Sequence, residues 1–240
     1  MEDVTVTGIV LSAMPYREND RLIQLFSVEL GKVTAILKGV ASSKAKMKFA
    51  GQVFCFGKFD LTASKGFYVV KGVDLVDSFF DLTQDYDIYK LSQSMLEVCS
   101  HILKPSIIAE KIFITLIKSL QNIVYNKIDA HIAVLKFFLS TLEDIGYGLN
   151  FETCDNCSMA FVGDIKFDEN SGTFRCVDCS GGVKVSRGDF MTLKLISSTE
   201  ISRLHTLKLR KELVSSCFKL VVEDLQLRLN CKLKSLDLTE

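Results

Sequence analysis

Four of the eight cysteines in the chain form two Cys-x-x-Cys pairs. They are Cys154 with Cys157 and Cys176 with Cys179, and eighteen residues separate the pairs. A Cys-x-x-Cys turn directs two thiolates at one point, and two such turns supply the four sulfur ligands of a tetrahedral zinc ion. The sequence therefore predicts one zinc ion per chain, bound by these four cysteines.

An alternative is that the two pairs are unrelated and that one of them is redox-active. A thioredoxin-type site would need a βαβ pattern around a single pair, which this sequence lacks. Four cysteine ligands leave no coordination position for water or substrate, so the zinc is predicted to be structural. Residues 149–180 carry six acids against two bases, a net charge of −4. Such a finger is poorly suited to phosphate, and we expect it to stiffen a domain or meet a protein.

The composition is that of a folded, soluble protein. The 240 residues are 48% hydrophobic and 24% charged, with a net charge of zero, which suits one large or two modest domains. The start of the sequence has no signal-peptide pattern, and no apolar run reaches the length of a membrane span. The other cysteines are expected to be buried thiols in a reducing compartment, and they are Cys55, Cys99, Cys217 and Cys231. We therefore expect a cytoplasmic protein.

The first third of the chain has the alternation of β-strands. Five runs are predicted, at residues 4–11, 22–27, 32–37, 52–62 and 67–76. Five short strands within about eighty residues are typical of a small closed barrel, and the OB-fold is the barrel of this size.

From residue 88 the apolar period becomes helical. Helices are predicted at residues 88–102, 107–124 and 128–145, with Pro105 in the first turn of the second. Ser186 and Asp189 resemble a capping box before a further helix. Leu213 and Cys217 begin the apolar stripe of a final amphipathic helix, whose polar side is expected to start at Glu223 and Asp224.

These elements predict an α+β protein: an N-terminal OB-fold β-barrel followed by a helical bundle with an inserted zinc finger. The predicted domains are an OB-fold for nucleic acid at 1–80, a helical domain at 81–150 that continues at 184–240, and the four-cysteine finger at 151–183.

Positive charge is concentrated in the barrel. Between Lys32 and Lys71 eight lysines stand against one acid, a net charge of +7. Spaced lysines among small residues suit a loop that follows phosphates, although a merely solvated loop would have the same composition. The predicted DNA contacts are Lys32, Lys38, Lys44, Lys46, Lys48, Lys58, Lys65, Lys71, Arg17 and Arg21. Glu18 and Asp20 lie beside the two arginines and are expected to be ion-paired rather than catalytic.

Several segments, in this order and spacing, resemble the bacterial recombination mediator family RecO. They are Tyr16-Arg17-Glu18-Asn19-Asp20-Arg21-Leu22, Glu29-Leu30-Gly31-Lys32, Leu37-Lys38-Gly39-Val40, and Leu135 through Ile145-Gly146-Tyr147-Gly148 to Cys154. The resemblance implies an OB domain, a helical domain and a four-cysteine zinc finger. It also implies binding of single-stranded and duplex DNA, strand annealing, and loading of recombinase with RecR on strands coated by single-strand-binding protein. The basic loop departs from the family pattern, because it has lysines where arginines are usual.

The resemblance implies one further partner site. The C-terminal tail of single-strand-binding protein is acidic with a terminal aromatic residue, so it requires an apolar pocket with a basic rim. Residues 184–219 carry eight bases against three acids, a net charge of +5, and could form the rim or an ordinary solvated helix face.

The sequence also bears on two other classes of function. An enzyme is not predicted, because the sequence has no phosphate-binding loop, no nucleophile elbow, no His-Glu-x-x-His motif and no zinc with an open position. The alternative is a zinc-ribbon adaptor for proteins without a direct role on nucleic acid. The favoured hypothesis is a non-enzymatic recombination mediator in the bacterial cytoplasm, associated with the nucleoid.

Overall fold

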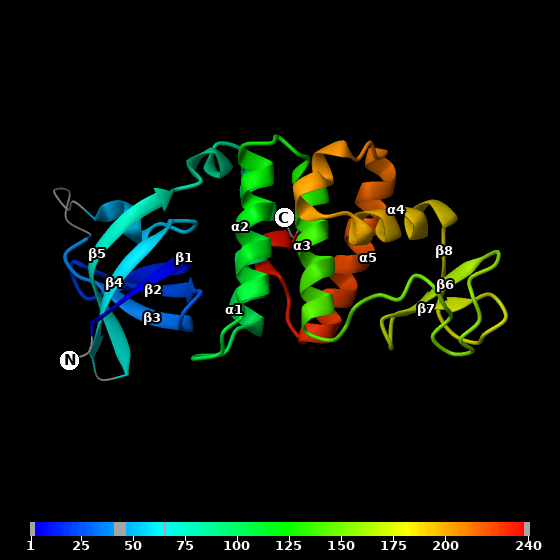
Figure 1. Cartoon of the computed structure of the whole chain (residues 1–240), viewed down its shortest axis with the longest axis horizontal. Helices are drawn as coiled ribbons and strands as arrows, with labels where there is room; N and C mark the ends of the chain where they lie inside the picture. The colour runs from blue at the N-terminus through cyan, green and yellow to red at the C-terminus, as the bar shows by residue number, and fades with distance from the viewer. Residues whose placement is uncertain (1–2, 41–46, 65, 238–240) are drawn as a thin grey trace. The chain divides into compact units, whose positions relative to one another are not determined.

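The structure is a computed structural model, and it describes residues 3–40, 47–64 and 66–237 (Figure 1). The chain forms two compact units, Met1–Ile114 and Thr115–Glu240.

The first unit contains a closed five-stranded barrel, coloured blue to cyan in Figure 1. Neighbouring strands follow the order β1-β2-β3-β5-β4, and β4 closes the barrel by pairing with β1. Among the described barrel strands, β3 and β5 pair in parallel and the other neighbours pair antiparallel. The predicted OB-fold barrel is confirmed. The strands are β1 (Asp3–Tyr16), β2 (Asp20–Ser27), β3 (Gly31–Leu37), β4 (Phe56–Ser64) and β5 (Phe67–Asp77).

The alternation of the sequence places one side of each strand inside the barrel. Val6, Ile23, Leu25, Phe59 and Leu61 are among the buried side chains of this core. Burial of such side chains, at about 25 cal/mol per Å² of apolar surface, is the main force that closes the barrel.

The fourth strand begins later than its phenylalanine pattern predicts. Residues 52–55 follow a short 3-10 helix, η1 (Lys48–Gly51), and turn through Phe54, which is buried and has φ of 69°. The amide of Phe54 donates to the Val10 carbonyl at 3.1 Å. Phe54 therefore fills the core from a left-handed turn, which a pattern of apolar residues cannot distinguish from a strand.

Helix α1 (Tyr86–Ile102) lies in the first unit and matches the predicted helix. Asp85 caps its N-terminus, where its carboxylate accepts from the amides of Asp87 and Ile88. A 3-10 turn, η2 (Phe80–Thr83), leads into it.

Helix α2 (Glu110–Val124) begins three residues later than predicted, and Pro105 is not in its first turn. Pro105 instead forms an isolated bridge with Gly31, and Ser106 has a left-handed φ of 62°. The backbone of residues 105 and 106 is thereby committed to the bridge and a turn, so the helix cannot start there.

In the second unit α3 (Ala130–Asp144), α4 (Arg187–Ser198) and α5 (Lys211–Leu229) pack against one another (Figure 1). Half of the predicted capping box is observed at α4, where Asp189 N–H donates to Ser186 Oγ at 3.0 Å. The Asp189 carboxylate accepts the Ser186 hydroxyl at 2.6 Å rather than the Ser186 amide. Short 3-10 helices lie at η3 (Ile201–Thr206) and η4 (Lys234–Leu236). None of the described helices is long and apolar enough to cross a membrane.

A small antiparallel sheet is inserted between α3 and α4. Its strands are β6 (Ile165–Asp168), β7 (Thr173–Cys176) and β8 (Val183–Val185), in the order β7-β6-β8. With the preceding residues from Cys154 it forms the segment called the finger below.

Candidate functional site

The two Cys-x-x-Cys segments are tight turns of the finger. In the first, the Cys154 amide donates to the Met159 carbonyl and the Ser158 amide to the Cys154 carbonyl, each at 2.8 Å. In the second, the Cys179 amide donates to the carbonyl of Cys176, the last residue of β7, at 3.3 Å. Each turn brings its two thiols to the same side.

All four sulfur atoms lie within 4.8 Å of one another. The sulfur atoms are 3.7 Å apart in Cys154–Cys179, 3.7 Å apart in Cys157–Cys176 and 3.5 Å apart in Cys176–Cys179. Four thiolates about 2.3 Å from a tetrahedral metal ion would be about 3.8 Å apart. The cluster predicted from sequence therefore has the donor atoms and the spacing to hold a metal ion.

The finger favours a thiolate at Cys154. Burial raises the pKa of this thiol, but the backbone amides of Cys176, Cys157 and Asn156 outweigh burial and lower the pKa to about 6. Elsewhere burial dominates: it raises the pKa of Cys55 and of Cys217 to about 12 and also raises that of Cys99. Cys55, Cys99 and Cys217 are buried thiols, as predicted, whereas Cys231 is partly exposed. Within the finger, the Met159 amide lowers the pKa of Cys157, but the hydrogen bonds with Cys154 and the other thiols outweigh it and raise that pKa to about 12. A thiolate is therefore favoured at Cys154 over one at Cys157.

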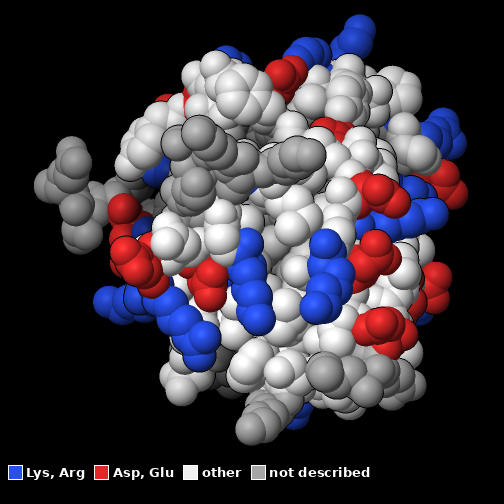
Figure 2. Space-filling model, turned by 90° about the vertical axis from the view of Figure 1, so that its left-hand side faces the viewer, with Lys and Arg blue, Asp and Glu red and all other residues white. Residues whose placement is uncertain are grey.

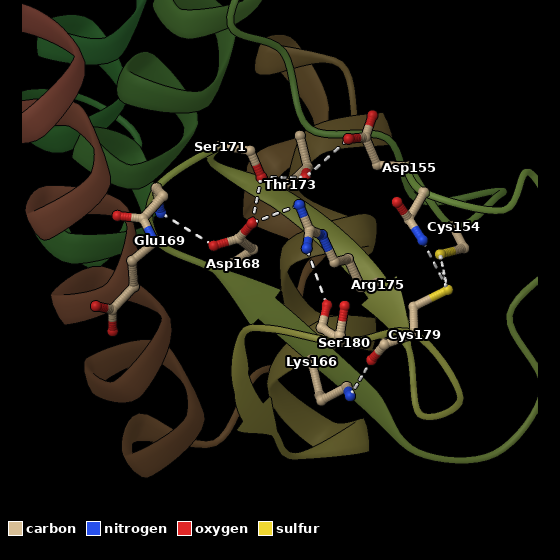
Figure 3. A network of polar contacts seen from close by, with 12 residues as sticks. Cys154, Asp155, Lys166, Asp168, Glu169, Ser171, Thr173, Arg175, Cys179 and Ser180 are labelled. Carbon is tan, nitrogen blue, oxygen red and sulfur yellow. Dashed lines mark hydrogen bonds and ion pairs between the residues drawn. The ribbon is translucent and has the colours of Figure 1, made fainter.

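An ion pair inside the small sheet supports the second turn (Figure 3). Arg175 Nη2 lies 2.6 Å from Asp168 Oδ2, and its Nη1 donates to the Ser180 carbonyl at 2.9 Å. Lys166 Nζ donates to the Cys179 carbonyl. The pKa of Asp168 lies below its usual value, chiefly because the Ser171 hydroxyl donates to its carboxylate. Burial opposes this shift, whereas the Asn170 amide and the charges of Arg175 and Arg228 add to it.

Arg228 of α5 joins the finger to the helices. Its Nη2 and Nη1 donate to the carbonyls of Glu169 and Asn170 at 2.6 and 2.9 Å, and its Nε pairs with Asp224 Oδ1 at 3.0 Å. The prediction that Asp224 lies on the polar side of α5 is wrong, because this residue is 5% exposed. The spacing of four residues between Asp224 and Arg228 could have predicted this ion pair from the sequence, because residues at that spacing lie on the same face of a helix.

Aromatic rings fill the space behind the cysteine turns. Phe174 of β7 contacts three other rings at centroid distances of 4.9 to 5.4 Å. They belong to Phe151, Phe167 and Phe190, and the last is on α4. The finger thus shares an apolar core with the helical unit.

The residues predicted to contact DNA divide into three groups. Two are engaged within the first unit: Lys32 Nζ donates to the Ser100 carbonyl and Arg21 Nη1 to the Gly51 carbonyl, both at 2.7 Å. Lys44, Lys46 and Lys65 lie outside the described residues. The remaining five have exposed side chains, and they are Arg17, Lys38, Lys48, Lys58 and Lys71.

Acids from neighbouring strands lie among these bases. Lys58 on β4 is in register with Asp74 on β5, and Asp60 accepts the Thr5 hydroxyl at 2.7 Å. In the view of the barrel in Figure 2, blue and red side chains are accordingly interspersed. The net charge of +7 was counted over residues 32–71 and leaves out Asp74, which lies beside Lys58 in the folded barrel. The count therefore overstates the positive charge of this surface.

Within the part of the chain that the structure describes, the predicted ion pairs around Arg17 and Arg21 are not formed. Asp20 Oδ1 accepts the Gly39 amide at 2.9 Å, and Arg21 is bound to a carbonyl. Arg17 lies over the ring of Tyr16, 5.2 Å from its centroid. These residues shape the turn between β1 and β2, and Asp20 anchors the chain after β3.

A groove of about 510 Å³ lies in the second unit between the start of α3, η3 and the start of α5. Its floor includes Leu204 and Val214. Its rim carries the bases Lys127, His131, His205, Lys208 and Lys211 against the single acid Asp129. We call it the basic groove. It is an apolar depression with a basic rim, and two of its lysines come from the stretch 184–219.

The fold and the site together define a class of protein: a closed five-stranded barrel joined to a helical unit that carries a four-cysteine finger. The family model described as "Recombination protein O N terminal" matches residues 1–79, and "Recombination protein O C terminal" matches residues 83–237. The chain belongs to the recombination protein O family.

Similar proteins match along almost their whole length. "DNA repair protein RecO" of Clostridium novyi is 29% identical over 233 residues, which cover 96% of this chain and 91% of that protein. The protein of the same name from Acetivibrio thermocellus is 23% identical over 241 residues, covering 99% of this chain and 96% of that protein. The resemblance seen in the sequence is confirmed.

Proposed function

We propose that this protein is a non-enzymatic recombination mediator in DNA repair. It binds and anneals single-stranded DNA, also contacts duplex DNA, and with RecR helps to load recombinase on strands coated by single-strand-binding protein. The observation that carries the proposal is the match of both family models, which between them span residues 1–237 except for 80–82. We place its action in the bacterial cytoplasm, at the nucleoid.

The barrel is the proposed DNA surface. Lys38 and Lys48 are exposed on either side of residues 41–46, the segment that contains two further lysines. Exposed ammonium groups bind the phosphate backbone without sequence preference and release counterions. Lys32 and Arg21, which hold backbone carbonyls, contribute mainly by keeping the barrel in shape.

We propose zinc as the metal of the finger. Soft thiolate donors in a tetrahedral arrangement are typical of structural zinc. Cys154, Cys157, Cys176 and Cys179 would fill its coordination sphere, so the ion would stabilise the fold and carry no reaction.

The basic groove is the proposed site for the acidic tail of single-strand-binding protein. An apolar floor would take the terminal aromatic ring, while Lys208 and Lys211 on the rim would pair with the carboxylates. The groove belongs to the second unit, so the tail would be bound by residues other than those proposed for DNA.

A salt titration of single-strand binding tests the DNA surface. In a variant with Lys44, Lys46 and Lys48 changed to Glu, affinity should fall for all sequences alike. The slope of log K against log salt should flatten by up to about 2, because each lost phosphate contact removes about 0.7.

The matched control changes Lys104, Lys118 and Lys232, which are also exposed, to Glu. It alters the net charge equally and should leave the slope unchanged. Equal slopes in both variants would place the DNA elsewhere, and no binding by the unaltered protein would favour the zinc-ribbon adaptor.

A further inference from the structure

A second groove of the helical unit lies between strand β8 and helix α5, with a volume of about 580 Å³. Val183, Lys184 and Val185 of β8 form one wall. Ser216, Leu220, Glu223 and Leu227 of α5 form the opposite wall, and their spacing of three or four residues places them on one face of the helix. We call it the β8 groove.

The wall made by β8 is the edge of a sheet. Among the described strands β8 pairs only with β6, so its other edge has backbone groups without a strand partner. Val183 on this strand is 60% exposed, and Leu227 across the groove is 55% exposed. An open edge beside exposed apolar side chains is the arrangement to which extended peptides add as a further strand.

The groove also has more acids than bases in its lining. It contains four acids, Glu169, Asp189, Glu223 and Asp224, and two lysines. Asp224 is paired with Arg228 at 3.0 Å, and Glu223 lies 3.9 Å from the exposed Lys219. Lys184 is paired outside the lining with Asp164 at 2.6 Å. Asp189 Oδ1 is buried and accepts no hydrogen bond from any residue that the structure describes. The α4 dipole offsets part of this charge, but the oxygen itself remains without a donor.

Both ends of the groove are held by side-chain contacts. At one end Arg228 binds the carbonyls of Glu169 and Asn170. At the other end Ser186 and Asp189 form the α4 cap, and Cys217 Sγ of α5 donates to the Asp189 carbonyl at 3.4 Å. The walls are therefore fixed before any ligand arrives, which lowers the entropic cost of binding.

We propose that the β8 groove binds an extended segment of a partner protein that carries a lysine or arginine beside an apolar residue. The segment would lie along the open edge of β8, with its cationic group at the exposed carboxylate of Glu223, in place of Lys219, and its apolar side chain against Val183 and Leu227. This site goes beyond the proposed mediator function. It requires a ligand of opposite charge to the acidic tail assigned to the basic groove.

The probe is a library of randomised peptides about seven residues long, selected against the full-length, metal-loaded protein. The selected peptides should combine a basic and an apolar residue. Binding of one such peptide is then measured by fluorescence polarisation. Leu227→Lys should weaken it about tenfold or more, because the variant removes apolar contact and adds a like charge.

Leu195→Lys is the matched control, since Leu195 on α4 is 44% exposed and does not line the groove. It should bind like the unaltered protein. Glu223→Lys should reverse the preference, so that a version of the peptide with Glu in place of its basic residue binds better. The inference is overturned if no peptide is selected, if the selected peptides are acidic, or if Leu227→Lys and Leu195→Lys bind alike. None of these outcomes bears on DNA binding.

Discussion

At the scale of single residues, Arg228 both neutralises a buried carboxylate on α5 and binds two carbonyls of the finger. Its side chain is 13% exposed and that of its partner Asp224 is 2% exposed. Burial raises the pKa of Asp224, while the hydrogen bond and charge of Arg228 oppose that rise. A buried carboxylate of this kind is tolerated only while its counter-charge is present.

Arg228→Met should therefore destabilise the helical unit by about 3 to 5 kcal/mol, since it leaves the Asp224 charge uncompensated and frees two finger carbonyls. Chemical unfolding followed by circular dichroism measures the change. The control is Lys219→Met, which removes the ion pair between Lys219 and Glu223 on α5. This pair also spans four residues, its charged atoms are 3.9 Å apart, and the Lys219 side chain is 79% exposed. The control substitution should cost at most about 0.5 kcal/mol. Equal effects would show that Asp224 is compensated by other groups.

The cysteines were predictable and Arg228 was not, for a physical reason. A Cys-x-x-Cys pair encodes its own turn, so its geometry is local and visible in the spacing of Cys154 and Cys157. The bonds of Arg228 to Glu169 and Asn170 span almost sixty residues and depend on how α5 packs. A carbonyl acceptor leaves no mark in the sequence, because every residue has one.

At the scale of elements, the finger has little regular structure of its own. Its strands are three or four residues long. Such short strands do not fold alone in water, and the ring cluster around Phe174 is shared with α4. Metal binding and helix packing should therefore support each other.

We expect one zinc ion per chain by elemental analysis, and Cys154→Ser should abolish it. Apparent binding free energies of structural zinc are on the order of 10 kcal/mol, so the helical unit should lose most of its stability while the barrel stays folded. Limited proteolysis would show fragments from residues beyond 115 first. Cys231→Ser is the control and should retain zinc. A protein purified without stoichiometric zinc would contradict this prediction.

Helix α3 offers a pH-dependent element. Asp129 caps it, with its carboxylate accepting the His131 amide at 2.9 Å. The pKa of Asp129 lies below its usual value, chiefly because the His131 side chain donates a hydrogen bond to its carboxylate. Burial opposes this shift, and backbone amides add to it. Unfolded aspartate titrates near pH 3.9, so this contribution to stability is present above that pH and is lost as the pH falls through the lower folded pKa.

Asp129→Asn should keep the cap but not the charge. Its free energy of unfolding should be lower than that of the unaltered protein at pH 7, by less than about 1 kcal/mol because the site is partly exposed and screened. The two proteins should converge as the pH falls through the lowered pKa of Asp129. Asp144→Asn, at the other end of α3, should show no such loss at pH 7, because a negative charge is unfavourable near a helix C-terminus. A constant difference across the pH range would rule out the ionised cap.

Element types were predicted better than element ends. The periodicity of α1 and the alternation of β2 and β3 identified these elements within about two residues. The start of α2 and of β4 were missed because Ser106 and Phe54 adopt left-handed backbone conformations that serve contacts elsewhere in the first unit. Such conformations are rare for these residue types, and nothing in the local sequence requires them.

At the scale of the whole molecule, a net charge of zero conceals separate surfaces of opposite character. The finger segment 149–180 is acidic, whereas the basic groove has five bases on its rim against one acid. Separate sites for DNA and for a protein are what the proposed mediator function requires, because both must be held at once.

The final prediction concerns annealing. Complementary strands coated by single-strand-binding protein should anneal faster with this protein, and removal of that protein's acidic tail should abolish the acceleration. Naked strands should anneal equally with either form, and ATP should have no effect because binding alone lowers the repulsion between phosphates. Changing Lys208 and Lys211 to Glu should reproduce the loss on coated strands only, whereas changing Lys118 and Lys232 to Glu should not. If coated strands anneal equally with and without the tail, the mediator function fails and a general DNA-binding protein remains.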